Sequence, residues 1–283
     1  MLTTRLWMGS LLAALTAGML VLDNHLAPAF PFLWLFQMFL SLIGCVELIL
    51  LLGPGRRPQI MTSLAGVLIM VSSNWATHAL LDSPWSGVLG CFVGLVLAVF
   101  IWEMALFQEE GRCVERMGLT LLILVYLGLL PCFFAQIRWL FTTEPERGSI
   151  ALALAIFVPK GCDIGAYFTG RLFGRHPLTP VLSPKKTWEG AIGGLIFAVL
   201  VAIGLDRWSA IGVLRHSLML EIGFGISVGF AGMLGDLAES LMKRDCRRKD
   251  ASQVVPGFGG VLDVVDAVIF AAPLAYVWMR WAM

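Results

Sequence analysis

The sequence predicts an all-α integral membrane protein that crosses the bilayer about nine times. Three observations support this fold class. The chain is 58% hydrophobic and only 14% charged, apolar stretches recur along its whole length, and lysine and arginine gather in alternate connecting segments. Soluble domains are about half apolar and a quarter charged, so the composition already separates this chain from them.

Each predicted span is close to the roughly twenty residues that an α-helix needs to cross the hydrocarbon core of a bilayer. In chain order, the nine spans cover 6–22, 29–52, 60–81, 85–107, 118–140, 149–169, 188–205, 218–242 and 259–281. The segments between them are too short to hold a soluble domain. The sequence therefore predicts a polytopic helix bundle.

The first apolar stretch also has features of a secretory signal peptide. Arg5 precedes it, and the small-residue sequence Ala27-Pro28-Ala29 follows it. The next span begins directly there, however, and the stretch is long for the apolar part of a signal peptide. We therefore expect it to be kept as the first transmembrane helix.

The connecting segments form two alternating sets that differ in positive charge. Cytoplasmic segments of membrane proteins are enriched in lysine and arginine. One set, which includes the segment before the first span, carries fourteen of the 20 basic residues, and the other carries five. This bias predicts a cytoplasmic N-terminus and a C-terminus on the outside. The fourteen are Arg5, Arg56, Arg57, Arg112, Arg116, Arg171, Arg175, Lys185, Lys186, Lys243, Arg244, Arg247, Arg248 and Lys249.

Composition and motifs exclude several other classes of protein. The net charge of +1 gives no basis for a nucleic-acid partner. The six cysteines contain no C-x-x-C pair and the four histidines are dispersed, so neither a disulfide framework nor a zinc site is predicted. No G-x-x-x-x-G-K-[ST] sequence is present, which excludes a P-loop.

Carboxylates gather near one end of the last two predicted spans. Asp236, Glu239 and Lys243 share one helix face because they lie at positions i, i+3 and i+7. Asp263 and Asp266 repeat the i, i+3 spacing, with no lysine or arginine near them in their own span. Acids at one membrane depth repel each other unless a cation lies between them. The pattern indicates a divalent cation such as Mg²⁺, although a proton relay or a cation transporter would use the same acids.

The basic cluster directly after the eighth span favours a phosphate-bearing ligand. The segment 243–249 holds five lysine and arginine residues, which is more than the neighbouring acids need as counter-ions. Acids beside a surplus of basic residues suit a metal-bound polyphosphate.

A second basic segment, 170–187, has the features of a phosphate-binding helix start. Ser183 followed by Pro184 predicts an N-cap and a first helical position, which places Lys185 and Lys186 in the first turn. Lysines there oppose the helix dipole unless an anion binds at that N-terminus. We expect phosphate binding, and two lysines that only set the topology are the alternative.

Other polar and small residues in the spans are expected to bring helices together. Lys160 and Asp163 lie one turn apart in the sixth span, where a structural ion pair and a functional role are both open. Gly225 and Gly229, four residues apart, predict a close contact between two helices. Four further residues are expected to form interhelical hydrogen bonds: Glu47, Asn74, His78 and Glu103.

The residues between about 160 and 266 resemble the phosphatidate cytidylyltransferase (CDP-diacylglycerol synthase) family. The family's C-terminal signature contains a Ser, a Lys-Arg pair, a Lys-Asp pair, a turn with Pro and Gly, and two Asp on the following helix. The segment DIGAYFTGRLFGRHPLTPVLSPKKTWEG is similarly family-like. Phe258 and Val264 stand where the family usually has His and Arg. The matching signature residues are Ser240, Lys243, Arg244, Lys249, Asp250, Pro256, Gly257, Gly259, Gly260, Asp263 and Asp266.

The resemblance implies an enzyme that transfers the cytidylyl group of CTP to phosphatidate, giving CDP-diacylglycerol and pyrophosphate for phospholipid biosynthesis. The active site would face the cytoplasm in a bacterial-type inner membrane, with Mg²⁺ held by Asp236 and Asp263. A second, monovalent cation and a homodimer are left open. Residues 1–148, with about five spans, would form a scaffold, and residues 149–283 would form the catalytic region with the basic cytoplasmic segments 170–187 and 243–258.

The expected site residues divide into two groups by role. The catalytic group is Asp236, Lys243, Arg244, Asp263 and Asp266. The substrate-binding group is Asp163, Ser183, Lys185, Lys186, Glu239, Ser240, Lys249 and Asp250.

Two other functions would use the same residues. The first is a CTP-dependent kinase of a membrane lipid, or a cytidylyltransferase for another lipid phosphate. The second is a cation- or proton-coupled transporter, which predicts acids near the bilayer midplane and repeated halves in the sequence. The acids lie near the predicted cytoplasmic ends of their spans and no internal repeat is visible, so the transporter ranks below the enzymes.

Overall fold

The computed structural model describes residues 2–53, 57–81, 83–108, 111–209, 211–252, 254–255 and 259–282. In this part of the chain, nine helical segments are long and apolar enough to cross a membrane. The prediction of an all-α, polytopic membrane protein is therefore confirmed. The side of the membrane that each terminus occupies stays a prediction.

The helices follow the predicted spans closely. Four of them precede the fifth span, which is divided into three parts, and four follow it. Their bounds are α1 Leu2–Asn24, α2 Pro31–Leu52, α3 Ile60–Leu80, α4 Pro84–Ala105, α5 Cys113–Ile123, η1 Leu124–Leu129, α6 Leu130–Trp139, α7 Pro145–Phe173, α8 Trp188–Trp208, α9 Leu218–Asp245 and α10 Leu262–Ala282.

The fifth span is interrupted by the π-helical turn η1. Pro131 follows this turn at the start of α6 and has no backbone N–H to donate into the helix. Single π-turns inside α-helices are often found at functional sites, and η1 carries Tyr126, whose side chain is buried.

A small antiparallel hairpin stands between α7 and α8. Its strands are β1 (Pro177–Thr179) and β2 (Ser183–Thr187), with Pro177 opposite Thr187. The predicted helix start at Ser183 is therefore wrong. The helix begins at Trp188, and the hydroxyl of Thr187 accepts the Gly190 N–H at 3.1 Å. In a two-stranded sheet both strands are edges, where proline is tolerated, so the Ser-Pro pair fits a strand as well as a helix start.

Close contacts between small residues hold the last four helices together. A Cβ added to Gly225 would lie 2.6 Å from Val199 Cα of α8, and one added to Gly229 would lie 2.8 Å from Ala198 Cβ. The predicted close contact at these two glycines is confirmed. These side-chain-free positions let α9 pack directly on α8.

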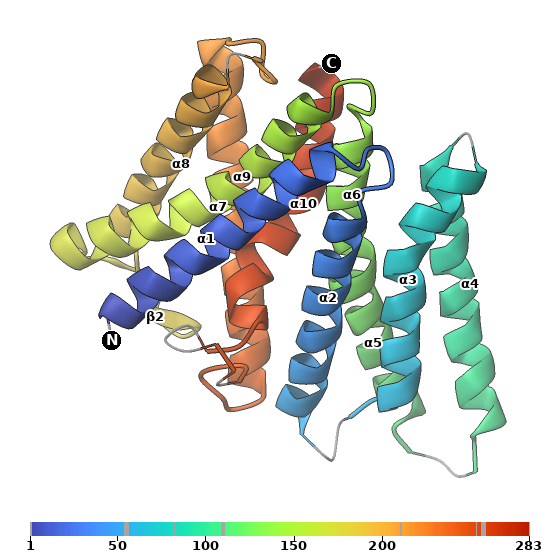
Figure 1. Cartoon of the computed structure of the whole chain (residues 1–283). Coiled ribbons are helices and arrows are strands. Elements are labelled where there is room, and N and C mark those ends of the chain that lie inside the picture. The colour runs from blue at the N-terminus through green and yellow to red at the C-terminus, as the bar shows by residue number, and fades with distance from the viewer. Residues whose placement is uncertain are drawn as a thin grey trace.

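Two groups of buried apolar residues meet at α10. One joins α10 to α1, α6, α7, α8 and α9, and the other joins it to α2, α3 and η1. By contrast, only Val88 and Glu103 are buried on α4, which lies at the edge of the bundle. Figure 1 shows β2 and the segment between α9 and α10 at one end of the bundle and the C-terminus at the other.

Of the four polar residues expected to form hydrogen bonds between segments, Glu47, Asn74 and Glu103 do so, whereas His78 connects helices by ring stacking and its Nδ1 has no hydrogen-bond partner among the described residues. Asn74 accepts a hydrogen bond from Gln136 at 2.9 Å, and His78 stacks on Trp139 with ring centroids 4.1 Å apart. Glu103 pairs with Arg116, and Glu47 binds the segment before α10.

Candidate functional site

Three carboxylates from two helices come together near one end of the bundle. Asp236 and Glu239 on α9 and Asp266 on α10 each offer an oxygen atom, and these atoms lie within 4.8 Å of one another. Glu239 is 0% exposed and Asp266 is 4% exposed. Helix α10 can approach because Gly235 has no side chain, and a Cβ there would lie 2.6 Å from the carbonyl oxygen of Asp266.

Two lysines from outside these helices neutralise part of this charge. Lys186 on β2 places its ammonium group 2.7 Å from Asp236 Oδ2. Lys160 on α7 lies 3.0 Å from Asp163 Oδ2 and 3.6 Å from Asp266 Oδ1. The ion pair considered for Lys160 and Asp163 therefore exists, and it belongs to the carboxylate group rather than to α7 alone.

A third lysine joins the two helices. The Lys243 ammonium group lies 2.5 Å from Glu239 Oε2 and 2.6 Å from Asp263 Oδ1. The second oxygen of Asp263 accepts the N–H groups of Ala251, at 3.1 Å, and Gly260, at 2.8 Å. Asp263 thus fixes the segment between α9 and α10 as well as binding Lys243.

The acids of α10 have no basic partner in their own helix, as the sequence indicated, and take their cations from other helices. Lys243 of α9 pairs with Asp263, and Lys160 of α7 pairs with Asp266. Lys243, which was counted among the residues that hold phosphate, is also a counter-ion for the acids. These partners belong to other helices, so reasoning along the last span alone does not reveal them.

The structure groups the expected metal ligands differently from the sequence. Asp236 lies with Glu239 and Asp266, whereas both oxygens of Asp263 are engaged by Lys243 and backbone N–H groups. Asp263 lies one helical turn before Asp266, closer to the end of the bundle. The carboxylate trio of Asp236, Glu239 and Asp266 is therefore the stronger candidate for a cation site.

The five carboxylates and three lysines described above form one group, and their charges favour a divalent cation. The carboxylates of this group outnumber its ammonium groups by two, so with every group ionised the excess equals the charge of one Mg²⁺ ion, and oxygen donors are those that Mg²⁺ prefers. Glu239 Oε1 is buried and has no hydrogen-bond partner among the described residues, so the donor set fits a cation there. We call this group the acid–lysine cluster: Asp163, Asp236, Glu239, Asp263, Asp266, Lys160, Lys186 and Lys243.

Tyr126 is a candidate site residue that the sequence analysis missed. Its side chain packs in the apolar group that contains Leu262 and Val265 of α10. Its hydroxyl is buried without a hydrogen-bond partner among the described residues, and four carboxylates of the acid–lysine cluster act on it electrostatically. A signal existed, because Tyr126 is one of only three tyrosines in the chain and lies inside a predicted span.

The hairpin directs its two lysines differently. Successive side chains of a strand point to opposite faces, so Lys186 reaches the acid–lysine cluster while Lys185 is exposed. Ser183 lies two residues before Lys185 and shares its face. The hairpin is held on α8 by Glu189, whose carboxylate accepts the N–H groups of Arg175 and His176.

The last turn of α9 lies beside the hairpin. Arg244 Nε donates to the carbonyl oxygen of Leu182 at 3.3 Å, which ties the hairpin turn to α9. Lys249 and Asp250 are exposed and Ser240 is half-buried. The structure therefore brings Arg244 to the hairpin and leaves Lys249 at the surface.

The glycine turn before α10 is described only at its two ends. Val255 and Gly259 exchange backbone hydrogen bonds of 2.7 and 3.0 Å, and Gly259 has a φ of +112°, which favours glycine. Pro256, Gly257 and Phe258 lie outside the described residues. Val264 is half-buried and packs against the apolar group of α2 and α3.

A second group of titratable residues lies where α8 leads into α9. Asp206, His216 and Glu221 each offer a ligand atom within 4.8 Å of the others. Asp206 and Glu221 already have partners in this structure. Asp206 accepts the N–H groups of Leu214 and His216, and Glu221 forms an ion pair with Arg207. These contacts hold the connection between the two helices.

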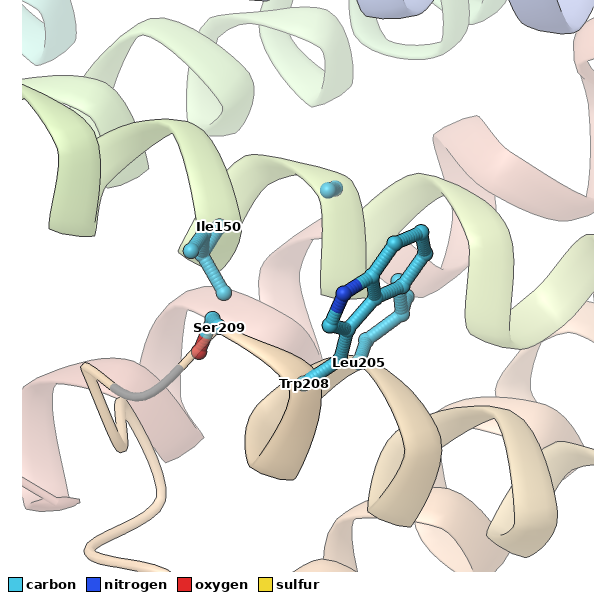
Figure 2. Close-up of a pocket in the computed structure, with 5 residues that line it drawn as sticks. Ile150, Leu205, Trp208 and Ser209 are labelled. Atoms are coloured by element: carbon cyan, nitrogen blue, oxygen red, sulfur yellow. The ribbon is translucent and has the colours of Figure 1, made fainter.

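A small apolar pocket between α7 and α8 is lined by no side chain that could act as an acid, a base or a metal ligand. Ile150, Leu205, Trp208 and Ser209 line it (Figure 2), together with Ala153. No titratable side chain is among its lining residues. The acid–lysine cluster, and not this pocket, is the candidate active site.

The fold and the site define a multi-pass membrane protein with ionic chemistry buried at one end of its helix bundle. A sequence model of the cytidylyltransferase family matches residues 3–282. The chain belongs to the cytidylyltransferase family.

Curated relatives agree with this assignment. The phosphatidate cytidylyltransferase of Synechocystis sp. is 32% identical over 252 residues, which cover 78% of this chain and 79% of the relative. The phosphatidate cytidylyltransferase of Staphylococcus epidermidis is 29% identical over 86% of this chain and 87% of its own length. Against the chloroplastic phosphatidate cytidylyltransferase 5 of Arabidopsis thaliana, identity is 33%, and the match spans about half (51%) of that relative's length.

Replacing Lys243 tests whether the cluster depends on its internal ion pairs. Lys243→Met keeps most of the side-chain length but leaves Glu239 and Asp263 without their shared cation. We expect a loss of about 3–5 kcal/mol in stability, measured as a lower Tm of the purified protein. The matched variant Lys249→Met changes an exposed lysine and should leave Tm nearly unchanged. Equal Tm values for the two variants would contradict the assigned ion pairs.

Proposed function

We propose that the protein transfers the cytidylyl group of CTP to phosphatidate, giving CDP-diacylglycerol and pyrophosphate. The observation that carries this proposal is the acid–lysine cluster, which has two more carboxyl groups than lysines, in a chain of the cytidylyltransferase family. The curated relatives bear the name of this activity.

The reaction is a direct phosphoryl-type transfer. A phosphate oxygen of the lipid attacks the α-phosphorus of CTP, and the bond from that phosphorus to the oxygen leading to the β-phosphate breaks. Pyrophosphate leaves with the electron pair of that bond. Such a transfer depends mainly on positioning and on neutralisation of charge, and the cluster and its basic surroundings offer both.

Asp236, Glu239 and Asp266 would hold Mg²⁺, which when bound supplies charge neutralisation to the phosphates. Of the pair expected from the sequence, Asp236 keeps this role. Asp263 holds Lys243 and two backbone N–H groups instead, so we assign it to positioning the start of α10.

The basic residues around the cluster would bind the phosphate groups of the two substrates. Lys185 and Lys249 are exposed, and Arg244 joins the hairpin to α9. Lys186 extends from the hairpin to Asp236, so its ammonium group lies between the surface and the buried acids.

The position of the cluster suits one substrate from lipid and one from water. The acyl chains of phosphatidate can remain in the bilayer while the headgroup meets CTP at the end of the bundle. CTP is a cytoplasmic metabolite, and the positive-inside rule places the basic segments on the same side. The site therefore faces the cytoplasm in this proposal.

The decisive test is product analysis with purified protein, CTP and phosphatidate. We expect CDP-diacylglycerol and pyrophosphate to form, EDTA to stop the reaction and added Mg²⁺ to restore it. Release of CDP with a phosphorylated lipid would instead identify a CTP-dependent kinase. In sealed vesicles, only CTP supplied to the face that carries the hairpin should react, and a reaction from the opposite face would refute the proposed orientation.

Two substitutions on α10 separate metal binding from positioning. Asp266→Asn should raise the Mg²⁺ concentration for half-maximal activity by tenfold or more, because a ligand of the trio loses its charge. Asp263→Asn should lower kcat with a smaller change in Mg²⁺ dependence. The reverse order would favour Asp236 and Asp263 as the ligand pair, and unchanged turnover in Asp263→Asn would remove that residue from the site.

Tyr126→Phe tests whether the buried hydroxyl takes part. The hydroxyl has no hydrogen-bond partner among the described residues, and one that it formed with a charged group during the reaction would contribute about 1.5–3 kcal/mol. We therefore expect kcat to fall by about tenfold to a hundredfold with little change in Tm. Tyr167→Phe is the matched control, because that tyrosine is exposed and bonded only to Arg171 in the described contacts. Equal kcat values for both variants would assign Tyr126 to packing alone.

A further inference from the structure

Glu47 is a buried carboxylate in the half of the chain that the sequence analysis treated as scaffold. It lies on α2 and is 3% exposed. Its recorded partners are neutral donors rather than a lysine or arginine: the hydroxyl of Ser252 at 2.6 Å and the N–H groups of Val261 at 3.0 Å and Leu262 at 2.8 Å. All three partners lie more than 200 residues away in the chain, in the segment that leads into α10.

The Glu47 carboxylate acts as a cap for α10 supplied by a different helix. Helix α10 begins at Leu262, and the first N–H groups of a helix have no partner within the helix. A negative charge at that end also interacts favourably with the helix dipole. One carboxylate on α2 therefore fixes both the position and the direction of the first turn of α10.

Gly260 permits this close contact because it has no side chain. A Cβ atom added to Gly260 would lie 2.5 Å from Glu47 Oε2 and 2.9 Å from its carboxyl carbon. Only a residue without a side chain lets the backbone come this close. The contact is thus built from both sides, by a buried acid on α2 and by a glycine before α10.

Consecutive backbone N–H groups before and at the start of α10 donate hydrogen bonds either to Glu47 or to Asp263 of the acid–lysine cluster. The Gly260 N–H donates to Asp263 Oδ2, while the next two N–H groups, of Val261 and Leu262, donate to Glu47. The other oxygen of Asp263 binds Lys243. A shift of this short segment would therefore move Asp263 and, with it, Lys243.

We propose that Glu47 is a positioning residue for the transfer reaction, which clamps the segment before α10 so that Asp263 and Lys243 keep their places in the acid–lysine cluster. Glu47 touches neither substrate in this proposal and acts through Asp263. The inference rests on the proposed function for its kinetic consequence, and the geometry of the clamp can be tested without it.

The test is Glu47→Gln, which keeps the size of the side chain but replaces one acceptor oxygen by a donor that faces backbone N–H groups. A displacement of about 1 Å at a catalytic group can lower a rate about a hundredfold. We expect kcat to fall by about tenfold to a hundredfold, with KM for CTP nearly unchanged. Hydrogen exchange in the full-length protein should become faster at residues 260–263. Ser252→Ala, which removes one donor to the same carboxylate, should change both measurements in the same direction and by less.

Glu103→Gln is the matched control. Glu103 is another buried glutamate of the N-terminal half, 7% exposed, but it pairs with Arg116 on α5 and not with the segment before α10. It should lower Tm without a change in kcat or in exchange at residues 260–263. A Glu47→Gln protein that behaves like Glu103→Gln would overturn the positioning role.

The two proposals fail in different ways. Wild-type protein that releases no pyrophosphate from CTP and phosphatidate refutes the proposed function, and the exchange rates still decide whether Glu47 clamps the segment. Active wild-type protein with unchanged kcat and unchanged exchange in Glu47→Gln refutes the clamp and leaves the function intact.

Discussion

The site depends on the cost of placing five carboxylates close together near one end of the bundle, two of them, Glu239 and Asp266, buried. A charged side chain inside a membrane costs about 3 kcal/mol on insertion scales, so the acids of α9 and α10 are stable only with cations beside them. Three lysines supply this charge, and they come from α7, from α9 and from the β1–β2 hairpin. Neutralising the acids therefore requires α7, α9 and the hairpin to pack against one another. Apolar burial is not the only reason for this packing.

The membrane fold could be predicted because its signals are local. Each span is a continuous apolar stretch of sufficient length, and the nine helical segments of the described residues follow them closely. The hairpin could not be predicted because the pair Ser183-Pro184 is compatible both with the start of a helix and with an edge strand. The strand forms here because Thr187 caps the helix instead, and because Glu189 binds the backbone of residues 175 and 176.

The site could be predicted as a set of residues but not as a set of contacts. The i, i+3 spacing of Asp236 and Glu239 and of Asp263 and Asp266 correctly marks the ends of α9 and α10 as the places where carboxylates gather. Spacing along one helix does not show that Lys160 lies beside Asp266, or that Lys243 lies between Glu239 and Asp263. The roles proposed for Glu47 and Tyr126 were harder still to predict, because they rest on packing and contacts with segments far away in the chain.

Gly235 has a consequence for how sequence variation in this chain should be read. The position carries no functional group, yet a methyl group there would overlap the backbone of α10 next to Asp266. Even alanine would have to push the two helices apart. The neighbouring acids would then move relative to one another although no polar atom had been changed. Mutational tolerance at residue 235 should thus be as low as at the charged positions, and a survey that scores only reactive side chains would overlook it.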